Sequence, residues 1–131
     1  MTISNDSAIF NPSTIDIEDV LMQIEGSVSQ INHINLNIQG KEQSFNSIMK
    51  HTPKHLQDIY SAFTANGIFT FNANVNGVFS RDNNPSFNMD FIMENGEYAL
   101  KKRSFILNQI TFKGDIQNGV GRNFEDTEIK I

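Results

Sequence analysis

Residue types that could do chemistry are present in this chain, but their spacing does not assemble a catalytic or metal site. His51 and His55 lie four residues apart, which is the separation of two metal ligands on one helical turn. Pro53 places a helix start between them, however, and no catalytic glutamate separates the two histidines. We therefore expect one histidine to cap the helix and the other to be exposed, with no metal bound.

The acidic residues and the missing cysteines also argue against an active site. Glu94 and Glu97 flank an Asn-Gly step and are typical of a turn, not of a catalytic carboxylate pair. The acidic run 125–128 lacks the alternating ligand spacing of a calcium loop. The chain has no cysteine, no Gly-x-Ser-x-Gly elbow and no glycine-rich phosphate loop. We predict a non-enzymatic protein without a cofactor or a metal.

The net charge of −5 is unevenly distributed along the chain. Residues 1–40 carry five carboxylates and no lysine or arginine, whereas residues 41–131 carry ten charges of each sign. Because binding to phosphates needs a basic face, we expect no nucleic-acid partner. The one basic cluster, 101–103, is typical of a solvated turn, with an anion or lipid-headgroup contact as the alternative.

The dominant hydrophobic period is two, which predicts β-strands. The clearest runs are Gly67–Ser80 and Ser86–Glu94, and the turn-forming residues 81–85 between them predict an antiparallel hairpin. One face of these two runs is apolar and carries Phe69, Phe71, Ala73, Val75, Phe79, Phe87, Met89, Phe91 and Met93. The opposite face is rich in asparagine, of which the chain contains seventeen.

Further strands are expected on both sides of this hairpin. Alternation predicts them at Ser27–Gln39, Phe105–Ile116 and Thr127–Ile131, with at most a frayed strand in residues 1–14.

Asn-Gly steps punctuate these runs. Those at 66–67, 95–96 and 118–119 predict tight turns with positive φ. A fourth, at 76–77, lies inside a strand pattern, where we expect a bulge or a close backbone approach.

Residues 44–63 depart from the strand period. Ser44 is a candidate cap for a short turn that carries Phe45, Ile48 and Met49. Pro53 is well placed as the first residue of a helix. The amphipathic stripe that follows consists of Leu56, Ile59, Tyr60 and Phe63. One or two short helices are therefore expected here.

These patterns together predict a mainly β fold. We expect residues 1–131 to form a single β-rich domain, or a segment of a larger repetitive β protein, built as an antiparallel, curved or sandwich-like sheet with one or two short helices at about residues 44–63. A row of phenylalanines left in water is costly, at roughly 25 cal/mol per Å² of apolar surface. The apolar face must therefore be covered by the helices, by a second sheet, by a ligand or by a partner.

The order of features in residues 50–131 resembles a stretch of the AsmA family. The resemblance is carried by the helix start Thr52-Pro53, the strand from Gly67 with Gly77 inside it, the strand entry Asn84-Pro85-Ser86-Phe87, the Asn95-Gly96 step and the closing strand 127–131. Members of that family are large proteins of the bacterial envelope, anchored in the inner membrane, with repetitive β-structure in the periplasm. They resemble bridges that carry lipid tails along a hydrophobic sheet face.

The resemblance implies a role in phospholipid transport or outer-membrane biogenesis. The implied lipid-binding side chains are Phe69, Phe71, Val75, Phe87, Met89, Phe91 and Phe112. Apolar side chains bury acyl chains without directional demands, and methionine adapts to irregular shapes. The implied partners are phospholipid, envelope proteins and neighbouring β-segments of a longer parent chain. The same apolar face would also suit a closed β-sandwich that serves as a structural or protein-interaction module without lipid.

The sequence shows no targeting or membrane-spanning segment. Residues 1–6 lack the basic and apolar regions of a signal peptide, and no run approaches the length of a membrane helix. Family members are many times longer and begin with a membrane helix, so we expect this chain to be an internal segment or a short relative. A periplasmic location follows from the resemblance alone.

Overall fold

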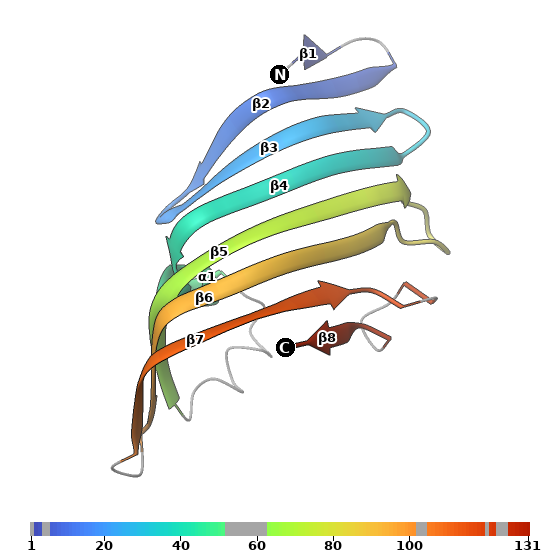
Figure 1. Ribbon diagram of the computed structural model, residues 1–131. Helices are drawn as coiled ribbons and strands as arrows, with labels where there is room; N and C mark the ends of the chain where they lie inside the picture. The colour runs from blue at the N-terminus through green and yellow to red at the C-terminus, as the bar shows by residue number, and fades with distance from the viewer. Residues whose placement is uncertain (1, 4–5, 52–62, 102–104, 120, 123–125) are drawn as a thin grey trace.

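The computed structural model describes residues 2–3, 6–51, 63–101, 105–119, 121–122 and 126–131. They form one eight-stranded antiparallel sheet in which the order of the strands follows the chain (Figure 1). The strands are β1 (Thr2–Ile3), β2 (Ser7–Ile17), β3 (Val20–Ser29), β4 (His33–Ser44), β5 (Phe63–Val78), β6 (Ser86–Leu100), β7 (Ile106–Gln117) and β8 (Glu128–Lys130). Within these residues there is a single helix, α1 (Phe45–Lys50), which follows β4 directly in the chain and precedes β5.

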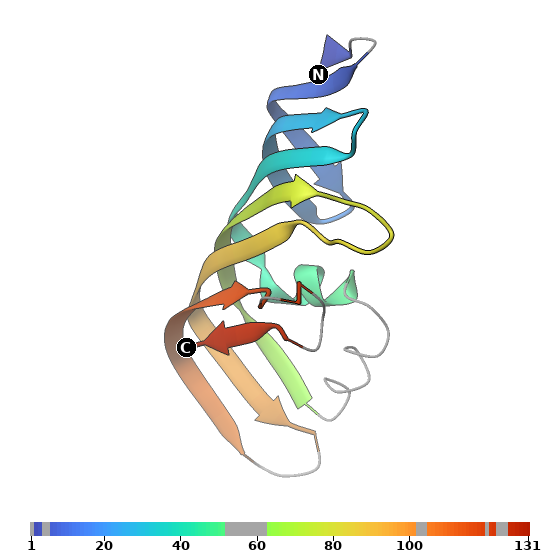
Figure 2. The same ribbon diagram turned by 90° about the vertical axis from the view of Figure 1, so that its right-hand side faces the viewer.

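The sheet is open and curved. Figure 2 shows it bending around one side, and α1 lies on the inner side of that bend. The ring of Phe45 on α1 lies 6.0 Å from the ring of Phe69 on β5, so Phe69 faces the same inner side. The mainly β, antiparallel prediction is confirmed, and the sheet is curved rather than sandwich-like, because the described residues contain no second sheet.

The register places most of the apolar positions of the strands on this inner face. Residues paired across an antiparallel sheet point to the same side, and side chains alternate along each strand. Phe71 lies opposite both Gly40 and Phe91, and Phe91 lies opposite Gly114. The inner face therefore continues across β4, β5, β6 and β7 without interruption.

The central hairpin forms as the alternation predicts. β5 pairs with β6 along almost its whole length, and the intervening turn is closed by a bridge between Ser80 and Asn83. The predicted strand Phe105–Ile116 corresponds to β7, and the closing strand corresponds to β8. Gly77 lies inside β5 with φ +131°, so the step at 76–77 is not a turn. The register with β4 shows no bulge there, and the nearest atom to a Cβ at Gly77 would be the backbone Cα of Pro85 at 3.3 Å.

One predicted strand is wrong, because Ser27–Gln39 spans the end of β3 and the start of β4. The chain reverses at residues 30–32, where the N–H of Asn32 donates to the carbonyl of Ser29 and Asn32 has φ +57°. Asparagine tolerates this left-handed conformation, and the isoleucine before it, Ile31, is 76% exposed. The alternation of apolar and polar residues continues through this turn, so the alternation alone does not show the reversal.

Two of the predicted Asn-Gly turns are also wrong. Residues 66–67 and 95–96 lie inside β5 and β6, where the register shifts on both strands. Some β-bulges accommodate a positive φ as tight turns do, and Gly67 (φ +151°) and Asn95 (φ +51°) both have positive φ at these irregularities. Glu94 and Glu97 therefore flank a bulge instead of a turn. Only the step at 118–119 follows the end of a strand.

The N-terminal third is more regular than expected. β2 is an eleven-residue strand where at most a frayed strand was predicted. It turns into β3 at Glu18 and Asp19, and Glu18 has φ +54°. Of the predicted helices, α1 is present, the start at Pro53 lies outside the described residues, and Phe63 begins β5 instead of ending a helix.

We predict that Gly26→Ala destabilises the sheet by about 2 kcal/mol more than Gly77→Ala. Both glycines have nearly the same positive φ, +133° and +131°, so both alanines carry the same backbone strain. A Cβ at Gly26, however, would lie 1.9 Å from the carbonyl oxygen of Asn35, whereas the nearest atom at Gly77 would be 3.3 Å away. Urea unfolding of the two variants measures the difference, and equal losses would contradict the close approach of β3 to β4.

Candidate functional site

The candidate site is the inner apolar face of the sheet. All seven side chains predicted from the sequence lie on it, because the register joins Phe71 to Phe91, Val75 to Phe87 and Phe112 to Met93. The face also includes residues of β2–β4 and β7 that were not in the predicted set. These are Phe10, Ile15, Val20, Met22, Ile24, Ile34, Leu36, Ile38, Ile110 and Ile116.

Aromatic rings form the centre of this face. Phe69 is buried, and its ring stacks on Phe91 at 5.4 Å with an interplanar angle of 27°. Phe91 in turn meets the edge of Phe112 at 6.0 Å, and Phe71 lies 5.9 Å from Phe69. Such ring pairs contribute roughly 0.5–1.5 kcal/mol beyond the area they bury. The cluster joins β5, β6 and β7 through side chains as well as through backbone hydrogen bonds.

Two glycines make room for the rings. A Cβ at Gly40 would lie 2.3 Å from the ring of Phe71. A Cβ at Gly114 would lie 3.0 Å from the ring of Phe91 and only 2.1 Å from the carbonyl oxygen of Lys130, so the neighbouring backbone also requires glycine there. Each ring therefore lies over the backbone of a neighbouring strand, where any larger residue would displace it. This arrangement explains why glycine occupies these two positions on a face that is otherwise formed by large side chains.

Most of the apolar face is only half-buried. Five apolar side chains are buried among the described residues, namely Val20, Ile24, Phe69, Ala73 and Met93. Phe71, Phe87, Phe91 and Phe112 retain intermediate exposure. The chain exposes 9194 Å², whereas a compact monomer of 14.8 kDa exposes about 7,000 Å². The excess is what a single-layer sheet with an uncovered face produces.

Helix α1 covers one end of the face. Besides the contact between Phe45 and Phe69, an ion pair and a histidine–carboxylate contact tie its C-terminal end to the β2–β3 turn. Lys50 lies 3.5 Å from Asp19, and the imidazole of His51 lies 3.7 Å from the carboxylate of Glu18. Exposed pairs of this kind contribute at most about 1 kcal/mol, so they orient the helix more than they stabilise the fold.

A buried amide connects the same region to β3. The side-chain oxygen of Gln43 accepts a hydrogen bond of 2.9 Å from the backbone N–H of Leu21, and its amide nitrogen donates to the carbonyl of Lys41. Gln43 is one of two buried polar residues in the described chain. It satisfies backbone groups at the bulge between Gly40 and Gln43, where the ladder of β4 and β5 is interrupted.

Within the described residues, no three His, Asp or Glu side chains come together as a group that could hold a metal ion. His51 lies beside Glu18 rather than beside a second histidine, and His55 lies outside the described residues. His33 is exposed, as its place on the polar face predicts. The basic cluster 101–103 is described only at Lys101. Chemically, the arrangement offers a large apolar surface on one face of the sheet.

The sequence also contains a pattern that predicts the part of the apolar face on β2 and β3. Ile15 and Ile17 alternate with polar residues, and Val20, Met22 and Ile24 continue the period of two, although Leu21 interrupts the polar side. The two runs are separated by Glu18-Asp19 alone, so they predict a second hairpin that extends the apolar face. Residues 15–26 carry four carboxylates and no aromatic side chain, so this hairpin differs in composition from the phenylalanine-rich runs.

Comparisons of this chain with protein-family models, with curated proteins and with solved structures find no match. In the described residues, no helix is both long enough and apolar enough to cross a membrane.

We predict that Phe91→Ala lowers the free energy of unfolding by about 2–4 kcal/mol, because it removes both the stack on Phe69 and the edge contact with Phe112. Phe105→Ala serves as the control, since Phe105 is 46% exposed and lies just before β7. Chemical denaturation should find the control within about 0.5 kcal/mol of the parent protein. Similar losses for the two variants would show that the ring cluster does not hold β5–β7 together.

Proposed function

We propose that this protein is a non-enzymatic β-rich module of an AsmA-like envelope protein, and that its inner apolar face takes up the acyl chains of phospholipid. One observation supports this more than any other. The sheet is a single open layer whose apolar face is continuous from β2 to β7 and stays half-exposed on the concave side. A face of this size rarely stays in contact with water in a soluble protein.

The chemistry of the face fits acyl chains. Each methylene removed from water is worth about 0.8 kcal/mol, so burial of part of one chain gives useful affinity without hydrogen bonds. Met22 and Met89 add flexible, polarisable side chains that adapt to chains of different shape. The face carries few hydrogen-bonding groups that would have to lose water when a lipid tail covers them.

The module would contribute to phospholipid transport or outer-membrane biogenesis as part of a longer periplasmic protein anchored in the inner membrane. The open edge of the sheet supports neighbouring β-segments as partners. β8 pairs only with Asp115–Gln117, so the rest of β7 has a free edge among the described residues. Ile106 and Leu107 on that part of β7 are 60% and 45% exposed. An incoming strand would satisfy these backbone groups and extend the apolar face.

A structural or protein-interaction module without lipid is the second candidate. The same free edge of β7 favours it, because strand addition needs only main-chain hydrogen bonds and a few side-chain pockets. In that case a protein surface, and not a lipid, would cover the apolar face.

The proposal predicts that the protein purified without detergent carries phospholipid and that Phe71→Asp removes it. A carboxylate on the apolar face would have to be desolvated beneath the acyl chains. Native mass spectrometry followed by lipid extraction should find a phospholipid adduct on the parent protein. The retained lipid should fall at least tenfold in the variant.

Asn72→Asp is the matched control. It adds the same charge one residue away, on the opposite face, and keeps an oxygen that can accept the hydrogen bond from Asn37. Circular dichroism establishes that both variants keep the strand signal. A parent protein that is free of lipid, or equal lipid loss from the two folded variants, would overturn the proposal in favour of the protein-interaction module.

A further inference from the structure

The convex face of the sheet carries an ordered lattice of amide side chains. The register aligns them in three rows that cross β3, β4, β5 and β6. The rows are Gln23, Gln39, Asn72 and Asp90; then Glu25, Asn37, Asn74 and Asn88; then Ser27, Asn35, Asn76 and Ser86. Neighbouring strands lie about 4.8 Å apart, so the polar groups repeat at that interval along each row.

Between β3 and β6 these rows are polar but nearly uncharged, whereas the first row continues onto the charged Asp115 of β7 and Lys130 of β8. Glu25 and Asp90 are the only ionisable side chains in the three rows. A face that served solubility alone would carry interspersed lysine and glutamate. Amides instead offer a donor and an acceptor on each side chain, which suits a neutral ligand that also both donates and accepts.

A network of hydrogen bonds holds the centre of the lattice in place. The amide nitrogen of Asn37 donates to the side-chain oxygens of Asn72 at 2.8 Å and Asn74 at 2.9 Å. The amide nitrogen of Gln39 donates to the side-chain oxygen of Asn37 at 2.9 Å. Asn37 thereby uses both of its N–H groups, and its neighbours are fixed before any ligand arrives. Such preorganisation lowers the entropy lost on binding.

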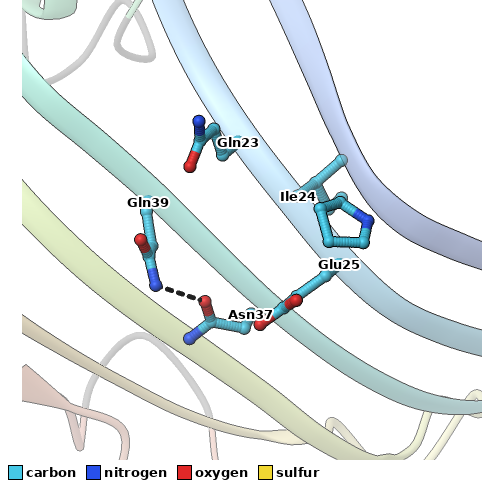
Figure 3. Close-up of a pocket in the computed structure, with 6 residues that line it drawn as sticks. Gln23, Ile24, Glu25, Asn37 and Gln39 are labelled. Atoms are coloured by element: carbon cyan, nitrogen blue, oxygen red, sulfur yellow. Dashed lines mark hydrogen bonds between the residues drawn. The ribbon is translucent and has the colours of Figure 1, made fainter.

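Two adjoining hollows lie beside this network. The first, of about 220 Å³, is lined by Pro12, Ile24 and the four polar side chains labelled Gln23, Glu25, Asn37 and Gln39 in Figure 3. The second, of about 430 Å³, shares Pro12, Glu25 and Asn37 with the first and continues over Asn35 to the exposed Ile9. A bulge between Phe10 and Ser13 on β2 places Pro12 at the wall of both.

Several polar groups in the hollows have no partner in the part of the chain that the structure describes. The side chains of Gln23, Glu25 and Asn35 make no hydrogen bond or ion pair there, and the side-chain oxygen of Gln39 accepts none. The hollows therefore combine free amide groups, one free carboxylate and an apolar wall of Pro12 and Ile9. Side chains held by hydrogen bonds and side chains without partners therefore lie next to one another on β3 and β4.

We infer that these hollows bind a neutral oligosaccharide. Sugar hydroxyls both donate and accept, so they match amides and a carboxylate, while the apolar face of a sugar ring packs on groups such as Pro12 and Ile9. An anionic ligand would be repelled by Glu25 and by the acidic N-terminal third of the chain. A single carboxylate is too few for a dedicated cation site.

A peptide fits this site less well than a sugar does. Peptides that bind sheets add a strand at an edge through main-chain hydrogen bonds. The hollows lie instead over β3 and β4, whose backbones are already paired on both sides. Their lining also lacks the deep apolar pockets that peptide side chains need. The inference does not depend on lipid binding, because the site lies on the opposite face of the sheet.

The experiment titrates maltotetraose and chitotetraose separately into the ¹⁵N-labelled protein and follows the side-chain amide signals by NMR. We expect saturable shifts for Gln23, Asn35 and Gln39 with at least one of the two sugars, and a dissociation constant in the millimolar range or tighter. Glu25→Ala and Gln23→Ala should each weaken binding about tenfold, because each removes a group that contacts the ligand. Both residues are exposed, so neither variant should unfold the sheet.

Asn88→Ala is the control, since Asn88 belongs to the same lattice but lines neither hollow. Its affinity should equal that of the parent protein. An uncharged Gly-Ser peptide of similar length should cause no shift. Absence of saturation with both sugars, equal weakening in the control, or shifts with the peptide alone would each overturn the inference.

Discussion

The fold depends on one constraint. A single-layer sheet has two faces, but each strand packs only against the strands beside it in the layer. In a sandwich the second sheet covers the apolar side, but here the described residues place only α1 over it. Backbone pairing and side-chain contacts within the layer must then supply most of the stability. The ring cluster around Phe91 supplies the side-chain part, because it joins three strands on the same face.

The bulges reconcile curvature with a constant inner face. A slip of one residue would turn every side chain of a strand to the opposite side. The register shifts at Gly40–Gln43, Asn66–Ile68 and Met93–Gly96 interrupt the ladder, but the inner face continues past the first and the third, where Phe69 pairs with Gln43 and Ile110 pairs with Gly96. Phe69 therefore faces inward beyond one bulge, just as Phe71 does before it. The residues with positive φ are the means by which a long strand curves and keeps its faces.

Much of this arrangement could be predicted from the sequence, because alternation is a local property of each strand. The hairpin of β5 and β6, and the seven side chains chosen on it and on β7, follow from period two alone. The predicted strand boundaries are wrong where turns and bulges use the same residue types. Asn32 reverses the chain without a glycine after it, whereas Asn95-Gly96 does not reverse the chain. Only the pairing with neighbouring strands decides between these outcomes, and that pairing is not written in the local pattern.

The strand order that follows the chain has a further consequence for how the protein is made. Each strand pairs with the strands just before and after it in the chain, so the sheet can assemble one strand at a time from segments that are neighbours in the sequence. A chain emerging from a ribosome or a translocation pore could then add each new strand to an edge that is already formed. Growth of this kind is similar to the stepwise folding of repeat arrays, in which length can change without a change in the local rules of assembly.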